Sequence, residues 1–285
     1  MAERGSSSLL RRLSRKSSGS GNEDNTVSGG PGGDWRGKRS SLFAAFSSPP
    51  ISGLPSEKAV WLDCDPGHDD AIALLLAVHH PDLRLVGVST VAGNAPGRST
   101  YLNAAKLLVA FGAHPDTVLL RGADEPLVKP ARKDAAIHGQ DGLGGVVGLP
   151  ALDSPEVLRR LWASPASSPA TGAGVGSLPR PSPADVCARL AQTIRERRAL
   201  NLAPLHLCVT GPCTNIALFI KTYPELVNSD SIAQIVVMGG SAGAAGNRGP
   251  MAEFNILVDP EAASIVFNAP VKVVMAGLNV THQGE

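Results

Sequence analysis

From residue 59 to the end of the chain, short apolar runs take turns with longer segments in which apolar and polar residues are mixed. Short apolar runs rich in Val, Ile and Leu are typical of buried strands, and they occupy residues 59–63, 83–93, 117–122, 204–211, 232–240 and 271–277. Between them lie longer segments with helical spacing, at residues 69–80, 98–112, 183–198, 215–226 and 259–268. Strands that alternate with helices through short connections predict an α/β fold, an open and mainly parallel sheet with helices on both faces.

Two segments depart from this alternation. Residues 1–57 are rich in Ser, Gly and Arg, so they cannot bury enough apolar surface to offset the entropy of ordering, and we expect a disordered tail. Acidic residues interrupt this tail, which argues against an organellar transit peptide. Residues 162–183 are rich in Pro, Ser, Ala and Gly. This composition predicts a surface insertion within a folded domain that covers residues 58–285.

The composition argues against nucleic acid and membranes as partners and favours a reducing compartment. The formal net charge is +1, so no global electrostatic signal points to nucleic acid. The four cysteines show no CxxC spacing, which favours buried thiols in a reducing compartment and therefore a cytoplasmic protein. No uninterrupted apolar run approaches the roughly 18 residues that a membrane span requires, and we expect no membrane partner.

The segment "WLDCDPGHDD" (61–70) carries the strongest chemical signal. Asp63 and Asp65 end a predicted strand, while Asp69 and Asp70 open the next helix, so the turn between them can bring carboxylates together. Converging carboxylates need a cation. Hard oxygen ligands without His or Cys at metal spacing favour Ca²⁺ or Mg²⁺ over Zn²⁺. Helix capping alone would need one aspartate and does not explain four.

Two other motifs give weaker signals. A DxD pair after a strand also marks phosphatases that form an aspartyl-phosphate, but Gly67 stands where those enzymes usually carry Thr or Val. The segment "GLGGVVG" (142–148) imitates a dinucleotide-binding loop, yet it follows no clear strand and lacks the G-x-G-x-x-G order. We therefore favour the metal site over both alternatives.

An ordered series of motifs gives the sequence a resemblance to a known family. The segment "LDCDPGHDDAIALLLA" (62–77) is followed by "TVAGN" (90–94), "IHGQDGLGG" (137–145), "TGPCTNIA" (210–217), "VVMGG" (236–240), "AEFNILVDPEAA" (252–263) and "GLNVTHQ" (277–283). Together they resemble the inosine–uridine-preferring nucleoside hydrolases, from about residue 59 to the last residue. The resemblance implies the Rossmann-like fold of that family. It also implies Ca²⁺-dependent hydrolysis of ribonucleosides, such as inosine or uridine, to ribose and free base.

The resemblance also implies roles for individual positions. Asp65 resembles a metal ligand that is also the general base toward the attacking water. Asp70 and the backbone carbonyl of Thr210 resemble further metal ligands, and Asp63 resembles a supporting carboxylate. Contacts to the ribose or the base are implied for Asp69, Asn94, His138 (at the base), Met238 (through its backbone), Asn247, Glu253 and Asn255. The resemblance gives no role to His68.

These roles agree with the chemistry of the bond. Its cleavage passes through a transition state that resembles an oxocarbenium ion, which surrounding negative charge stabilises. A ring of Asp, Asn and Glu around the ribose would reject a 2′-deoxy sugar, because its polar groups would stay unpaired. The partner that we expect is thus a small-molecule ribonucleoside. The relatives are usually homo-oligomers, so the resemblance also implies self-association.

Some positions have simpler interpretations. Asn94 follows Gly93 and equally fits an ordinary turn residue. Asp259 and Pro260 predict a helix N-terminus, with Asp259 as its cap. Cys213 has no His or acid beside it in the sequence, which indicates a buried thiol and not a nucleophile.

The match departs from the family on its C-terminal side. The family continues beyond the segment that ends at Glu285, with a His–Asp pair whose Asp completes the metal shell. We therefore expect a nucleoside hydrolase of which the C-terminal third is missing, weakly active as it stands. The alternative is a non-catalytic ribose-binding or partner subunit. An incomplete ligand set would hold Ca²⁺ weakly, because affinity depends on the charge of the ligands.

Overall fold

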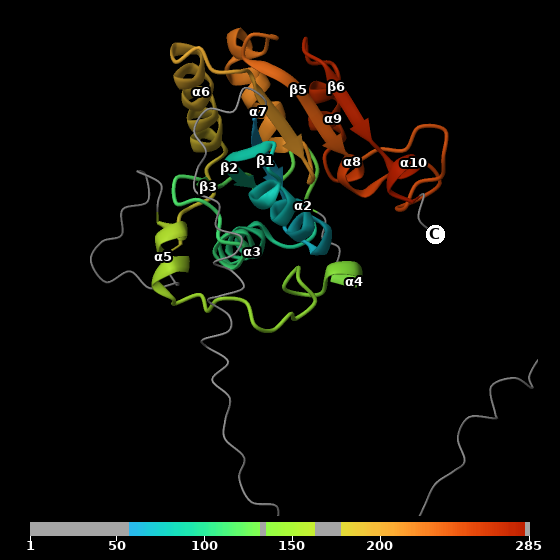
Figure 1. Ribbon diagram of the computed structural model, residues 1–285. Helices are drawn as coiled ribbons and strands as arrows, with labels where there is room; N and C mark the ends of the chain where they lie inside the picture. Colours follow the sequence, from blue (N-terminus) through green and yellow to red (C-terminus); the bar gives the residue numbers. More distant parts are fainter. Residues whose placement is uncertain (1–56, 132–134, 163–177, 283–285) are drawn as a thin grey trace, which may run out of the picture. The chain divides into compact units, whose positions relative to one another are not determined.

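A computed structural model describes residues 57–131, 135–162 and 178–282 of the chain. All of them belong to one unit of the chain, residues 45–285, and Figure 1 draws the described residues as coloured ribbon. The predicted tail at 1–57 lies outside the described residues except for its last position. The predicted insertion at 162–183 is described only at its two ends, and residues 163–177 lie outside.

Six parallel strands form one sheet within the described residues. They are β1 (Lys58–Cys64), β2 (Leu83–Thr90), β3 (Val118–Arg121), β4 (Leu205–Val209), β5 (Ile232–Met238) and β6 (Val273–Ala276), in the order β3-β2-β1-β4-β5-β6. Every pairing between neighbours is parallel. Each strand lies inside or overlaps one of the apolar runs, so the predicted parallel α/β sheet is confirmed.

Helices cover both faces of this sheet, as predicted. On one face lie α2 (His68–His79) and α3 (Gly97–Ala110), and on the other α6 (Pro183–Ala199), α7 (Thr214–Thr222) and α9 (Pro260–Phe267) (Figure 1). Trp61 and Leu62 show how one strand serves both layers, because successive side chains point to opposite faces. Trp61 packs in a buried cluster with α6, α7 and α9, and Leu62 in a second cluster with α2 and α3.

Helix ends follow local signals in the sequence. Asp259 caps α9 and accepts a hydrogen bond from the third residue of the helix, with Pro260 first, as predicted. The helix expected at 215–226 ends earlier, at Thr222, because Pro224 cannot continue it, and a 3-10 turn η3 (Pro224–Leu226) follows. No described helix combines the length and apolarity needed to cross a bilayer.

Four further helices were not predicted. They are α4 (Ala135–His138), α5 (Pro155–Leu161), α8 (Phe254–Val258) and α10 (Leu278–Thr281). One or two turns are too short for helical periodicity to emerge from the sequence, and such helices depend on tertiary packing for their stability. Two of them, α4 and α8, carry predicted site residues.

The order of the strands creates a crevice at the centre of the sheet. The chain builds outward from β1 on one side through β2 and β3, and on the other through β4, β5 and β6. Ligands of open α/β sheets bind at such a switch point, outside the carboxyl ends of the strands. The ends of β1 and β4 lie side by side there, since Asp63 pairs with Val209. Asp65 and Thr210 follow directly after these two strands.

A groove of about 380 Å³ runs along the face of the sheet that carries α2. Residues of β4 and β5 line it together with Leu76 of α2, and it reaches Thr210 and Met238 at the carboxyl edge of the sheet. Large apolar side chains remain in contact with solvent on this side, since Leu76 is 56% exposed and Val274 of β6 is 36% exposed. The crevice is therefore open along one flank in the described part of the chain.

Gly87 of β2 is required by the packing of Trp61. The indole is fully buried, its Nε1 donates to Ser89 Oγ at 2.9 Å, and a Cβ on Gly87 would overlap its ring. We predict that Gly87→Ala lowers the free energy of unfolding by about 1–3 kcal/mol, because overpacking displaces the indole. Urea unfolding followed by circular dichroism measures the loss. Arg84→Ala, at an exposed position of the same strand, is the control, and equal losses in both variants would contradict the packing argument.

Candidate active site

The turn between β1 and α2 carries the four aspartates that the sequence singled out. Gly67 is the N-cap of α2, so the helix begins directly after the Pro-Gly turn, and its dipole favours carboxylates in its first turn. Asp69 is exposed. The other three aspartates are fully buried: Asp63, Asp65 and Asp70.

Asp65 lies at the switch point, directly behind β1. Its Oδ2 accepts the backbone N–H of Asn94 at 2.7 Å, and its own carbonyl accepts Asn94 Nδ2 at 3.1 Å. Its Oδ1 is buried and accepts no hydrogen bond from any described residue. A Cβ on Gly93 or on Gly211 would collide with the carboxylate, so these two glycines provide the space that holds it. The arrangement leaves one aspartate oxygen available to a ligand.

Asp70 joins the turn to the loops that follow β2 and β4. Its Oδ2 accepts the Gly67 N–H at 2.9 Å and Asn94 Nδ2 at 3.3 Å, and its Oδ1 accepts the hydroxyl of Thr210 at 2.6 Å. Asn94 is thus more than a turn residue, because its amide spans Asp65 and Asp70. The structure brings these four predicted residues together from three separate segments.

Asp63 is held within the sheet by two residues that the sequence analysis missed. Its Oδ1 accepts hydrogen bonds from Ser89 Oγ and, at 2.9 Å, from Asn215 Nδ2. Asn215 also donates to the carbonyl of Thr90 at 3.1 Å and accepts the N–H of Ala123 at 2.9 Å. A single serine within a strand, or a single asparagine within a helix, forms no sequence pattern that would mark it as a site residue. The only available clue was that Asn215 stands inside one of the family motifs.

Burial raises the pKa of all three inner carboxyls. Loss of hydration is the largest cause in each case, and the negative charge of a neighbouring aspartate adds to it. The pKa of Asp63 and that of Asp70 rise to about 7, and the pKa of Asp65 rises well above its ordinary value. None of the ion pairs between described residues involves them. Buried carboxyls in this situation are stable either protonated or around a cation.

The donors at this point fit a hard cation. They are oxygens only, from the carboxylates of Asp65 and Asp70 and from Thr210, which suits Ca²⁺. A cation would satisfy the isolated Oδ1 of Asp65 and offset the buried negative charge. The set is not a full shell, because nowhere in residues 57–131, 135–162 and 178–282 do three His, Cys, Asp or Glu side chains gather at metal-binding distances.

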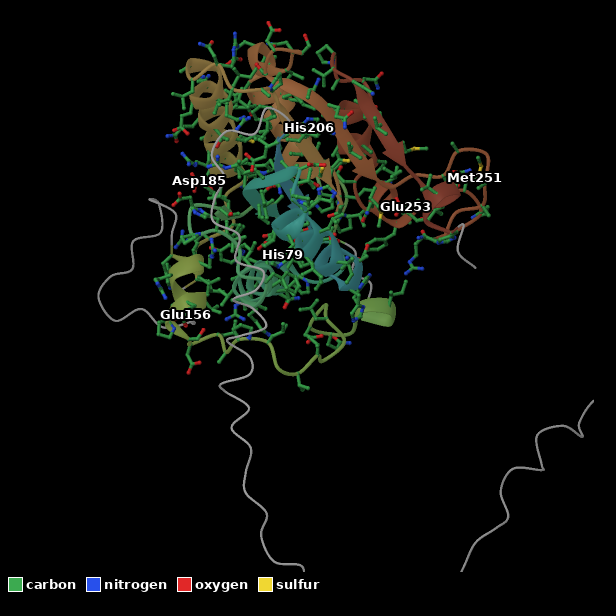
Figure 2. The ribbon with its side chains drawn as sticks, viewed as in Figure 1. His79, Glu156, Asp185, His206, Met251 and Glu253 are labelled. Carbon is green, nitrogen blue, oxygen red and sulfur yellow. The ribbon has the colours of Figure 1, made fainter. Side chains whose placement is uncertain are left out.

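A second polar cluster lies across the crevice, on β5 and α8. Asn255 Nδ2 donates to the carbonyls of Thr210 at 2.9 Å and Met238 at 3.1 Å. Glu253, labelled in Figure 2, is the N-cap of α8 and accepts the N–H of Gly240 at 2.9 Å. Asn255 therefore connects this cluster to the aspartate turn through Thr210.

Two further predicted contacts lie on loops. His138 is half-buried at the end of α4, and its Nδ1 accepts the backbone N–H of His68 at 3.3 Å. Burial lowers the pKa of His138. Asn247 is exposed between β5 and α8, and its recorded contact is through its carbonyl, which accepts Arg248 Nη1 at 2.9 Å. The structure thus brings His138 to the aspartate turn and does not bring Asn247 into this network. Its ribose contact stays a prediction.

Two motifs set aside in the sequence are placed as expected. The Gly-rich segment at 142–148 follows α4 and no strand, so it lacks the context of a dinucleotide-binding loop. Cys213 is buried before α7, and burial raises the pKa of its thiol. A protonated, inaccessible thiol is a core residue and not a nucleophile.

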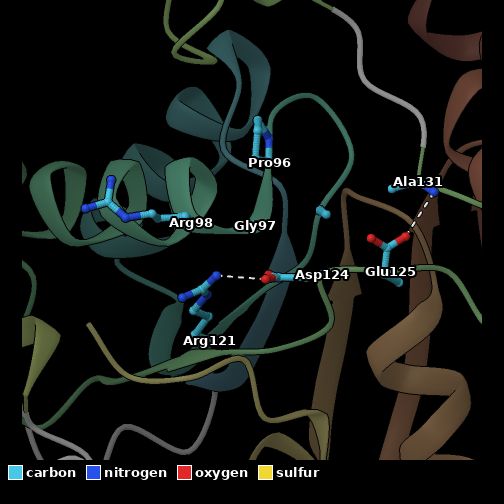
Figure 3. Close-up of a pocket in the computed structure, with 8 residues that line it drawn as sticks. Pro96, Gly97, Arg98, Arg121, Asp124, Glu125 and Ala131 are labelled. Atoms are coloured by element: carbon cyan, nitrogen blue, oxygen red, sulfur yellow. Dashed lines mark hydrogen bonds and ion pairs between the residues drawn. The ribbon is translucent and has the colours of Figure 1, made fainter. Parts of the chain in front are cut away.

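A smaller cavity of about 170 Å³ beside the start of α3 contains no predicted site residue. Figure 3 shows that three of its charged side chains are engaged, since Arg121 Nη2 lies 2.7 Å from Asp124 Oδ2 and Glu125 accepts the N–H of Ala131 at 3.0 Å. Asp124 also packs against Gly97, the first residue of α3, where the helix dipole favours a carboxylate. This cavity therefore reflects how α3 is anchored.

Comparison with known proteins finds nucleoside hydrolases both among related sequences and among solved structures. The pyrimidine-specific ribonucleoside hydrolase RihA of Salmonella paratyphi A is 41% identical over 224 residues, which cover 79% of this chain and 61% of that protein. Among solved structures, a plant nucleoside hydrolase (PpNRh1) aligns with a TM-score of 0.61 at 29% identity, over 79% of this chain and 61% of that one. A purine-preferring ribonucleoside hydrolase from Gardnerella vaginalis aligns with the same TM-score and identity, over 79% and 62%.

The chain spans less than two thirds of the length of these relatives. A family model, that of the inosine-uridine preferring nucleoside hydrolases, matches residues 60–285. The match includes every residue of the candidate active site. The chain therefore belongs to the inosine-uridine preferring nucleoside hydrolase family.

Proposed function

We propose that the protein hydrolyses the N-glycosidic bond of ribonucleosides to ribose and free base, in nucleoside catabolism, with Ca²⁺ as its cofactor. The isolated Oδ1 of Asp65 is the observation that carries this proposal. A fully buried carboxylate with a raised pKa, at the carboxyl edge of a parallel sheet, is suited to take a proton.

Asp65, Asp70 and Thr210 would hold the cation. When bound, Ca²⁺ supplies positive charge that keeps the carboxylates ionised and makes water more acidic. Asp65 would also be the base that accepts the proton of the attacking water, while the Asn94 N–H holds its Oδ2 in place. Asp70 stays fixed throughout, since the turn and the Thr210 hydroxyl hold both of its oxygens.

The ribose would lie between the aspartate turn and the cluster on α8. Asn255 uses its amide N–H groups on the carbonyls of Thr210 and Met238, which leaves its side-chain oxygen as the group that can accept a ribose hydroxyl. Asp69 is exposed at the start of α2 and can accept a second hydroxyl. Negative charge on this side favours the positive charge that develops on the sugar.

We propose pyrimidine ribonucleosides, uridine before inosine, as the substrates. Relatives named pyrimidine-specific share 41% identity with this chain, whereas the structure named purine-preferring shares 29%.

The four free cysteines support a reducing, cytoplasmic location.

A second candidate function is a non-catalytic ribose-binding or partner subunit. The two-carboxylate donor set favours it, because the described residues contain no cluster of three metal-binding side chains and Ca²⁺ affinity depends on the charge of the ligands. Binding of ribose without turnover of any nucleoside would support this alternative.

Asp65 provides the direct test of catalysis. We predict that Asp65→Asn lowers ribose release from uridine, with Ca²⁺ present, by roughly 10²–10⁴-fold, the usual contribution of a general base. A reducing-sugar assay measures the release. Asp82→Asn, at an exposed aspartate after α2, is the matched control. An Asp65→Asn variant as fast as the unchanged protein would remove the proposed base.

Calcium binding can be measured without turnover. We predict that Ca²⁺ raises the melting temperature of the protein, because a ligand at 100 times its dissociation constant stabilises the folded state by about 2.7 kcal/mol. Asp70→Asn should remove the effect, and Asp82→Asn should keep it. Thermal unfolding with Ca²⁺, Mg²⁺ and chelator gives the comparison. Equal stabilisation of the Asp70→Asn variant would place the cation elsewhere.

The ribose contacts predict discrimination at the 2′ position. Groups built to bond a hydroxyl remain unpaired when it is missing, so kcat/KM for 2′-deoxyuridine should fall by roughly 10⁴-fold relative to uridine. Parallel assays with both nucleosides measure the ratio. Values within about tenfold of each other would show that the site does not read this hydroxyl.

A further inference from the structure

We infer that His68 is a positioning residue that fixes the orientation and the proton of His138. The two histidines come from different segments: His68 is the first residue of α2 and His138 the last of α4. Figure 1 shows α4 beside one end of α2. The inference rests on the proposed function and on the contact to the nucleobase that the family resemblance implies for His138.

The backbone of His68 determines which nitrogen of His138 carries the proton. The first N–H groups of a helix have no partner within the helix, and that of His68 donates to His138 Nδ1 at 3.3 Å. A nitrogen that accepts a hydrogen bond carries no proton, so the neutral ring of His138 holds its proton at Nε2. The positive end of the α2 dipole also disfavours a second proton on this ring.

The ring of His68 determines how His138 is oriented. The two imidazoles stack with their centroids 5.4 Å apart and their planes 28° apart. A Cβ on Gly67 would come within 2.5 Å of His138 Nδ1, and a Cβ on Gly144 within 2.9 Å of His68 Nε2. Two glycines therefore leave the room that this pair of rings occupies.

The loop after His138 is fastened to the same turn. Gly144 donates its N–H to the carbonyl of His138 at 2.8 Å. Asn103 of α3 donates to the carbonyl of Asp141 at 2.7 Å and to that of Pro66 at 3.3 Å. His138 is therefore held by backbone contacts on its loop and by His68 at its ring, and the ring contact is the one that a substitution can remove selectively.

A neutral imidazole held in this way offers Nε2–H as a donor and suits a carbonyl oxygen of the base. In a pyrimidine nucleoside the carbonyl beside the glycosidic nitrogen gains negative charge as the base departs. A donor placed there stabilises the transition state more than the bound substrate. Displacing His138 should therefore lower kcat more than it raises KM.

Three variants separate the contributions of ring and backbone. His68→Phe keeps both an aromatic ring and the N–H, His68→Ala keeps the N–H alone, and His68→Pro removes both. Proline is well tolerated at the first position of a helix, so α2 should still form. Histidine-specific ¹⁵N labelling with long-range ¹H–¹⁵N spectra reports which nitrogen of each of the seven histidines is protonated, and His138→Asn assigns the signals.

We expect the Nε2–H form of His138 in the unchanged protein and in His68→Phe. His68→Ala should keep that form with a more mobile ring, and His68→Pro should gain a measurable Nδ1–H fraction. A proton on Nδ1 in the unchanged protein would overturn the inference. Spectra of His138 that are identical in all variants would overturn it as well. Because this measurement needs no turnover, an inactive protein with Nε2–H at His138 would refute the proposed function alone.

Steady-state kinetics of the same variants, with uridine as substrate and Ca²⁺ present, test the inference a second way. We expect kcat/KM to fall by roughly tenfold in His68→Pro, as for other residues that orient a functional histidine, with most of the fall in kcat. The matched control is His114→Ala, at an exposed histidine away from the site. A His68→Pro variant with unchanged kcat and KM would contradict the positioning role.

Discussion

Asp65 keeps its carboxylate fully buried beside two others at the carboxyl edge of β1, and much of the surrounding structure offsets the cost of that burial. Taking a charge out of water without compensation costs several kcal/mol. The compensation that the described residues provide is neutral throughout, from backbone N–H groups, hydroxyls and asparagine amides. Hydrogen bonds of this kind orient the carboxyl groups and supply no positive charge to balance them.

The topology explains how so many neutral donors converge. Because β4 lies beside β1, the loops after these strands meet although they are far apart in the sequence. Thr210 is the junction: its hydroxyl binds Asp70 and its carbonyl accepts Asn255. The acidic half of the site and the half on α8 are thus coupled through one residue, so a shift of α8 would be transmitted to Asp70.

The strands and the aspartate turn could be predicted from the sequence, each for a physical reason. The strands were predicted because parallel strands buried on both faces are continuous apolar runs. The aspartates were found because four acids at a strand-to-helix turn are costly without a ligand. Ser89 and Asn215 were missed, because their role depends on a partner far along the chain. His68 was missed for a related reason: its backbone N–H acts on His138, 70 residues away, and no side-chain pattern reports such a contact.

Under the proposed function, the neutral character of the donors also bears on the transition state. An arginine or lysine among them would stabilise the buried carboxylates well, yet it would cancel the field that attracts a cation and favours positive charge on the sugar. His138 also adds no positive charge while it is neutral. Burial lowers its pKa, even though Asp69 acts in the opposite direction. A histidine kept neutral can donate to the base without adding positive charge beside the ribose. In the proposed function, proton placement at His138 and charge retention at Asp65 would serve a single requirement, that positive charge be reserved for the metal and the sugar.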